Sequence, residues 1–141
     1  MAMISGAIAA AVCLTHVTES LKGLMPTSLS LVGTAEQVVL VSTESSRTIA
    51  THGVHLTSAG DAEDIRVFAH HLLSDVQDLV VCHLGTPWPS NADGAPLSVW
   101  TSRTGDTIQL GFARAGASVE RADVALPDFA CPRPGARLTA G

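Results

Sequence analysis

An alternating run near the C-terminal end constrains the fold of this chain most strongly. In residues 107–114 every second side chain is apolar, namely Ile108, Leu110 and Phe112. Successive side chains of a strand point to opposite faces, so this period of two predicts a strand with one buried face. The preceding run, residues 97–102, connects to it through Thr104-Gly105-Asp106, which is turn chemistry typical of a β-hairpin. We therefore predict an antiparallel sheet.

Five further segments contribute to the predicted sheet or its connections. Residues 28–33 and 37–42 are β-rich runs joined by a tight turn at 34–36, and residues 47–56 form a weaker strand followed by a loop. Residues 79–84, LVVCHL, are short, apolar and rich in β-branched side chains, which indicates a central strand. Three prolines and an Asp-Gly pair make residues 85–96 a loop.

Two segments have helical periodicity. In residues 5–24 apolar side chains recur at steps of three and four, and Pro26 ends the run. In residues 61–76 Asp61 is placed to cap a helix whose apolar face includes Phe68 and Leu72. We predict an α+β domain: an antiparallel sheet of about five or six strands, with helix 5–24 on one face and helix 61–76 on the other.

Composition excludes some classes of function. The chain has 141 residues, the usual size of one domain, with 46% hydrophobic side chains and a net charge of −5. Lys22 is the single lysine and the seven arginines are scattered, so we expect no nucleic-acid partner. The apolar start has no preceding positive residue and is too short to span a bilayer, so we expect neither a cleaved signal nor a membrane partner. Three widely spaced cysteines suit a reducing cytoplasm.

The histidines and cysteines of residues 68–84 do not have the spacing of a metal site. His70 and His71 are adjacent and diverge on a helix, whereas zinc ligands on one helix stand four residues apart. Cys82 and His83 are also neighbours, so they point to opposite faces of a strand and do not form a nucleophile–base pair. We expect hydrogen-bonded or solvent-facing histidines, with neither catalytic nor metal-binding residues, and no cofactor can be named.

The order of elements and several local strings resemble the GAF family of sensory domains. That family carries an A-H-x-x-L segment before an L-V-V strand, which here is similar to residues 69–73 and 79–81. A Gly-Ala-Pro-Leu string follows at residues 94–97, and a G-x-x-I-type strand at residues 105–110. Residue His83 stands where the family usually has Asp, and a strand-bearing segment before residue 94 is shortened. The signatures of the cyclic-nucleotide, bilin-binding and methionine-sulfoxide-reducing subtypes are missing.

The resemblance implies a single GAF-like domain over residues 1–114, with residues 115–141 as a short helix or an irregular Pro-rich tail. It also implies a ligand pocket roofed by residues 61–76 and 85–96, with a floor that includes the strands at residues 79–84, 97–102 and 107–114. The candidate ligand-binding residues are Phe68, Leu72, His83, Trp88 and Trp100. Phe68 and Leu72 also fit an ordinary core, and Trp88 also fits simple packing under its flanking prolines.

These observations favour a non-enzymatic sensory or regulatory module that binds a small molecule or a partner protein. A cysteine- or histidine-dependent enzyme, a metal-binding protein, and an interaction scaffold without a pocket are the alternatives. Helix 5–24 carries Ile4, Ile8 and Val12 beside its main apolar stripe. We therefore predict a possible homodimer through this helix.

Overall fold

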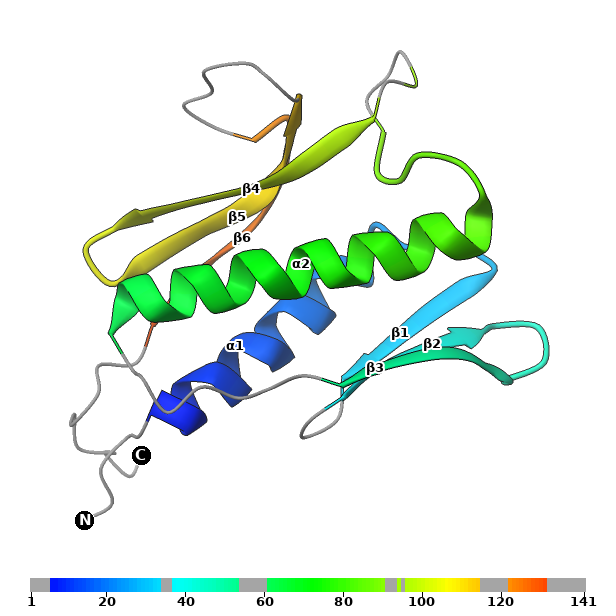
Figure 1. Cartoon of the computed structure of the whole chain (residues 1–141), viewed down its shortest axis with the longest axis horizontal. Coiled ribbons are helices and arrows are strands. Elements are labelled where there is room, and N and C mark those ends of the chain that lie inside the picture. Colours follow the sequence, from blue (N-terminus) through cyan, green and yellow to red (C-terminus); the bar gives the residue numbers. More distant parts are fainter. Residues whose placement is uncertain are drawn as a thin grey trace.

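The computed structural model describes residues 6–33, 37–53, 61–90, 94, 96–114 and 122–131. The helices are α1 (Gly6–Leu21) and α2 (Ala62–Leu84). The strands are β1 (Leu29–Gly33), β2 (Gln37–Ser42), β3 (Thr48–Gly53), β4 (Leu97–Thr104), β5 (Thr107–Arg114) and β6 (Val124–Ala130). The order of one helix followed by three strands thus occurs twice (Figure 1). The fold is α+β, as the sequence predicts.

The strands form two antiparallel sheets of three, in the orders β1-β2-β3 and β4-β5-β6. The structure therefore does not show the single sheet of five or six strands, or the GAF-like arrangement, that we expected. Helix α1 contacts both β1 and β6, and His16 Nε2 donates to the carbonyl oxygen of Pro127 in β6 at 2.8 Å. Proline has no N–H to donate and the carbonyl is already bonded, so β6 is a poor partner for another strand here.

Both predicted hairpins are confirmed. Strands β1 and β2 pair antiparallel, and β3 adds to β2 where the weaker strand was expected. The predicted turn at 34–36 lies outside the described residues. Strands β4 and β5 pair over eight positions, and Gly105 in their connection has a φ of 61°, a conformation that glycine adopts without steric cost.

Residues 79–84 are helical, so the prediction of a central strand there is wrong. Helix α2 begins after the N-cap Asp61, whose side chain accepts from the Asp64 N–H, and it ends at Gly85 with a φ of 72°. Its buried positions continue in steps of three and four through Val76 to Val80. A short apolar run fits a buried strand or a buried helical turn equally well, and here the helix is simply longer than predicted.

The C-terminal prediction also needs correction, because residues 124–130 form β6 and pair with β5. The pairing shifts register beside Gln109, where Pro127 and Asp128 stand opposite one residue of β5. A β-bulge of this kind accommodates a proline that would otherwise interrupt the ladder. The remaining tail, residues 115–121 and 132–141, lies outside the described residues.

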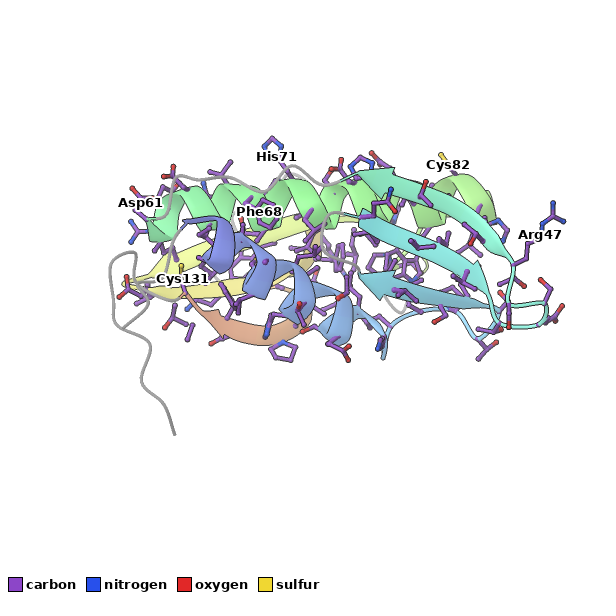
Figure 2. All side chains as sticks on the ribbon, turned by 90° about the horizontal axis from the view of Figure 1, so that it is seen from below. Arg47, Asp61, Phe68, His71, Cys82 and Cys131 are labelled. Atoms are coloured by element: carbon purple, nitrogen blue, oxygen red, sulfur yellow. The ribbon has the colours of Figure 1, made fainter. Side chains whose placement is uncertain are left out.

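The core joins the two helices to the inner faces of both sheets. Helix α1 contacts α2 directly, and α2 contacts β2, β4 and β5, so the helices do not cover opposite faces of one sheet (Figures 1 and 2). The largest fully buried side chains are Phe112, Leu21, Leu31, Leu40, Ile65, Leu73, Ile108, Leu110, Val17, Val38, Val76 and Val80. Within the described residues, neither helix is long and apolar enough to cross a membrane.

Candidate ligand cavity

A cavity of about 270 Å³ opens on the sheet formed by β4, β5 and β6. All three strands contribute to it, so its shape depends on the whole C-terminal sheet. Its lining residues are Trp100, Ser102, Thr104, Gln109, Leu110, Ala122, Ala125, Leu126 and Asp128.

Strand alternation decides which β4 side chains reach this cavity. Thr101 bonds to side chains of α2, so it marks the inner face of the strand. Its neighbours Trp100 and Ser102 therefore point to the outer face, together with Thr104 two residues further on. The cavity lies on the side of β4 that faces away from α2.

One wall of the cavity depends on a close approach of β6 to β5. A Cβ atom at Gly111 would overlap the Val124 carbonyl oxygen and lie 2.5 Å from the Ala122 Cβ. The absence of a side chain at Gly111 therefore lets the start of β6 lie against β5. The result is that Ala122 and Ala125 border the cavity opposite β4.

The polar lining of the cavity includes acceptor oxygens beside the donors of Ser102, Thr104 and Gln109. Asp128, which is exposed, is the one ionisable side chain among the described residues of the lining. The Gln109 Oε1 atom is buried and has no hydrogen-bond partner, and its Nε2 lies 3.4 Å from Thr104 Oγ1. An unsatisfied buried acceptor costs about 1–3 kcal/mol, so such a group is often explained by a missing partner.

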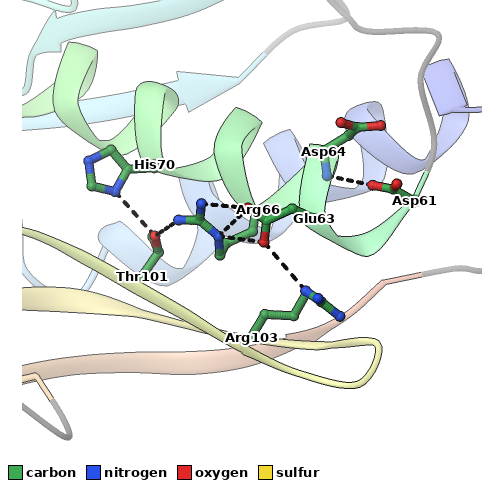
Figure 3. A network of polar contacts seen from close by, with 7 residues as sticks. All are labelled: Asp61, Glu63, Asp64, Arg66, His70, Thr101 and Arg103. Atoms are coloured by element: carbon green, nitrogen blue, oxygen red, sulfur yellow. Dashed lines mark hydrogen bonds and ion pairs between the residues drawn. The ribbon is translucent and has the colours of Figure 1, made fainter.

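A polar network holds the inner face of the same strand (Figure 3). Arg66 Nη1 donates to Thr101 Oγ1 at 3.0 Å, and His70 Nδ1 lies 3.1 Å from the same oxygen. Arginine can only donate, which leaves the hydroxyl proton for Nδ1 of a neutral His70. Glu63 binds Arg66 at 2.7 Å and Arg103 at 3.4 Å, so the first half of α2 is fixed to β4.

The charges of this network are consistent with a structural role. Hydrogen bonding to Arg66 lowers the pKa of Glu63 to about 2, with a smaller contribution from Arg103. Burial lowers the pKa of His70 below 6.5, and the nearby Arg66 and His71 lower it further. A neutral His70 therefore stays bonded to Thr101 near neutral pH.

The structure separates the five candidate residues that the sequence suggested. Leu72 is buried in the core and Phe68 packs against it half-buried, whereas His83 is exposed near the end of α2. Trp88 is buried, donates from Nε1 to the Leu24 carbonyl at 3.1 Å, and stacks edge-on against Phe112. Trp100 is the member of this set that lines the cavity.

Gln109 and Asp128 were missed by the sequence reasoning. Gln109 is in a strand that we predicted, but its polar position suggested a solvent-facing side chain. Asp128 stands beside a proline in a segment predicted to be helical or irregular. A signal for Asp128 was the spacing of apolar Leu126 and Phe129 on either side of it, which fits a bulged strand.

The histidines and cysteines do not gather in the described part of the chain, where no three potential metal ligands form a group. His71 and Cys82 point away from the rest of the molecule (Figure 2). His52 Nε2 pairs with Asp75 Oδ2 at 2.8 Å and links β3 to α2. Burial, together with the nearby Cys131, raises the pKa of Cys13 to about 12, which makes that thiol a poor nucleophile.

No family model, curated protein or solved structure matches the chain. The function is therefore inferred from the chemistry of the site itself.

Proposed function

We propose that this chain is a non-enzymatic sensory or regulatory module that binds a small molecule in the cavity of the C-terminal sheet. The buried, unpartnered Gln109 Oε1 in the lining is the observation that carries the proposal. A concave site with one large aromatic side chain and a few polar groups is the usual form of a small-molecule site. Trp100 supplies the aromatic surface here.

We retain a GAF-like sensory role for the module and expect it in the cytoplasm. The alternative ligand of such a module is a partner protein. One version is a second copy that meets α1. Many side chains of α1 already pack within the chain, and Val12 is an exposed large apolar side chain among its described residues. Self-association therefore needs its own test, separate from that of the cavity.

An enzyme is a weaker candidate, although Thr101 and His70 form a hydroxyl–imidazole pair of the kind used in nucleophilic catalysis. The Thr101 hydroxyl also accepts from Arg66 and faces α2, away from the cavity. We assign the pair to the attachment of α2 to β4.

Saturation-transfer NMR with a mixed set of small fragments tests the proposal. The proteins compared are the wild type, Trp100→Ala and the control Val32→Ala, which removes an exposed apolar side chain from β1 in the other sheet. We expect fragments that bind the wild type and the control but not Trp100→Ala, with circular dichroism to verify folding. Binding by none of the proteins, or equally by all three, would contradict a small-molecule site here.

A further inference from the structure

We propose that the cavity recognises an organic cation, namely a primary ammonium or guanidinium group. This inference rests on the proposed function, because it names the ligand class of the same cavity. The first supporting observation is the charge of the cavity lining. Asp128 carries the one ionisable group of the described lining, and that group is a carboxylate.

Arg103 of β4 and Arg66 of α2 do not neutralise the negative charge of the cavity lining. Arg103 and Arg66 are on the inner side of β4, where both pair with Glu63. The outer side therefore presents a negative group without a cation among the described residues that line it. An anionic ligand would meet repulsion there, and the net charge of −5 favours the approach of cations.

The neutral groups of the cavity suit the same ligand. The face of a tryptophan ring attracts ammonium and guanidinium groups, and Trp100 lines the cavity. Such groups carry several N–H donors and no acceptor, which complements Gln109 Oε1 and the hydroxyls of Ser102 and Thr104. The buried oxygen has almost no exposed surface, so it accepts from the ligand once the Gln109 amide turns towards the cavity.

The size of the cavity limits the ligand. Its volume of about 270 Å³ is just below the range of roughly 300–1,000 Å³ typical of sites for drug-sized molecules. A single cationic head on a short chain therefore fits better than an extended molecule. Two sources have this chemistry: a free amine, and a lysine or arginine side chain of a partner protein.

Isothermal titration calorimetry with matched probes tests the inference. The probes are n-butylammonium, n-butylguanidinium, n-butanol and butyrate, which share a short chain and differ in the head group. We expect the two cations to bind and the alcohol and the carboxylate to bind at least about tenfold more weakly, because their head groups carry no positive charge for Asp128 and Trp100. Asp128→Asn should weaken cation binding by roughly tenfold, since the variant keeps the shape and removes the charge.

The control is Asp78→Asn, which neutralises an exposed carboxylate on α2 and should change the affinity by less than about twofold. Equal effects of the two variants would overturn the inference, because they would show a response to net charge alone. Butyrate or butanol binding as tightly as the cations, with binding lost in Trp100→Ala, would overturn the ligand class but leave the cavity as a binding site. Binding of none of these probes or of the mixed fragments would remove the proposed function itself.

A pair of peptides separates the two sources. One is a short capped glycine peptide with a central lysine, and the other has that lysine acetylated. Loss of binding on acetylation supports the cation, and unchanged binding overturns it. If the lysine peptide binds at least about tenfold more tightly than n-butylammonium, the ligand is assigned to a partner protein. Equal or weaker peptide binding assigns it to a free amine.

Discussion

The two three-stranded sheets follow the same order of elements but are buried differently. In the N-terminal sheet the central strand β2 alternates, with Val38 and Leu40 buried and the positions between them less so. In the C-terminal sheet the central strand β5 is buried at four consecutive positions, 110–113. The first pattern is typical of a sheet packed on one face, and the second of a sheet covered on both.

At Gly111 the second face of β5 is covered, because Ala122 and the Val124 carbonyl lie over it. That cover leaves a hollow between β6 and the side chains of β4, which is the cavity. The site therefore follows from the close approach of residues 122–125 to Gly111 in one of the two sheets. Variants that act on this approach should differ from equivalent variants in the other sheet.

The largest effect is expected from Gly111→Ala. The new methyl group would overlap the Val124 carbonyl, which is backbone and cannot turn away, so overpacking should lower the free energy of unfolding by about 1–3 kcal/mol. The matched control, Gly53→Ala in β3, meets no atom within 4 Å and should stay within about 0.5 kcal/mol of the wild type. Urea unfolding of both proteins measures the difference. Similar losses in the two variants would contradict the difference between the sheets.

The attachment of each sheet to α2 gives a smaller effect. Gln77 Nε2 donates to the carbonyls of Leu97 at 2.7 Å and Trp88 at 3.2 Å, so Gln77→Met should lower the free energy of unfolding by about 1–2 kcal/mol. In the N-terminal sheet the pair His52–Asp75 is more than a third exposed on both sides. Asp75→Asn should therefore cost less than about 1 kcal/mol. Urea unfolding measures both variants. A larger loss of stability in Asp75→Asn than in Gln77→Met would show that α2 is attached more strongly to the N-terminal sheet, contrary to this prediction.

The pH dependence of stability reports on the network under β4. Because the pKa of His70 is lowered in the folded state, the unfolded chain binds more protons as the pH falls through 6.5. Stability is therefore highest above that value and decreases towards about pH 5, where histidine is largely charged. His70→Gln should flatten this decrease in the thermal midpoint, whereas the exposed control His83→Gln should keep it. If the thermal midpoint of His70→Gln decreases as much as that of the wild type, groups other than His70 cause the decrease.

At more acidic pH a second loss should follow. The pKa of Glu63 is lowered to about 2 by its bonds to Arg66 and Arg103. The contribution of Glu63 to the free energy of unfolding is present above its ordinary pKa of 4.5 and disappears as the pH falls towards 2. Glu63→Gln should remove this part of the acid transition. The same acid transition in Glu63→Gln and the wild type would show that the pairs contribute nothing measurable.

The smallest effect concerns assembly. Val12 is 43% exposed on α1, so Val12→Glu should leave the fold unchanged and shift any dimer through this helix towards monomer. Light scattering coupled to size-exclusion chromatography measures the mass. A wild type that is monomeric at high concentration would exclude the homodimer, and a dimer unaffected by the variant would place the interface elsewhere.

Most helices and strands could be predicted because their periodicity is local. Alternation identified β5, and the Gly105 turn identified its hairpin with β4. Residues 79–84 were misassigned because a short apolar run fits either a strand or a helix, and only the packing of Val80 into the core distinguishes them. The separation of the strands into two sheets depends on contacts of α1 that no local pattern contains.

The cavity was less predictable than the fold. Trp100 was a candidate because the GAF resemblance implies that residues 97–102 form part of the floor of a ligand pocket. Asp128 reaches the cavity through a bulged strand that contains Pro127, and proline in a sequence normally argues against a strand. The site is therefore built by the least regular strand of the sheet.

Fluorine NMR of the protein labelled with 5-fluorotryptophan tests the central claim most directly. The chain has two tryptophans, one lining the cavity and one buried in the core, so the wild type should give two signals, assigned with Trp100→Phe. On titration with n-butylammonium we predict that the Trp100 signal shifts in a saturable way while the Trp88 signal stays in place. If neither signal shifts, or if both shift together, the outer face of the C-terminal sheet is not the cation site that we propose.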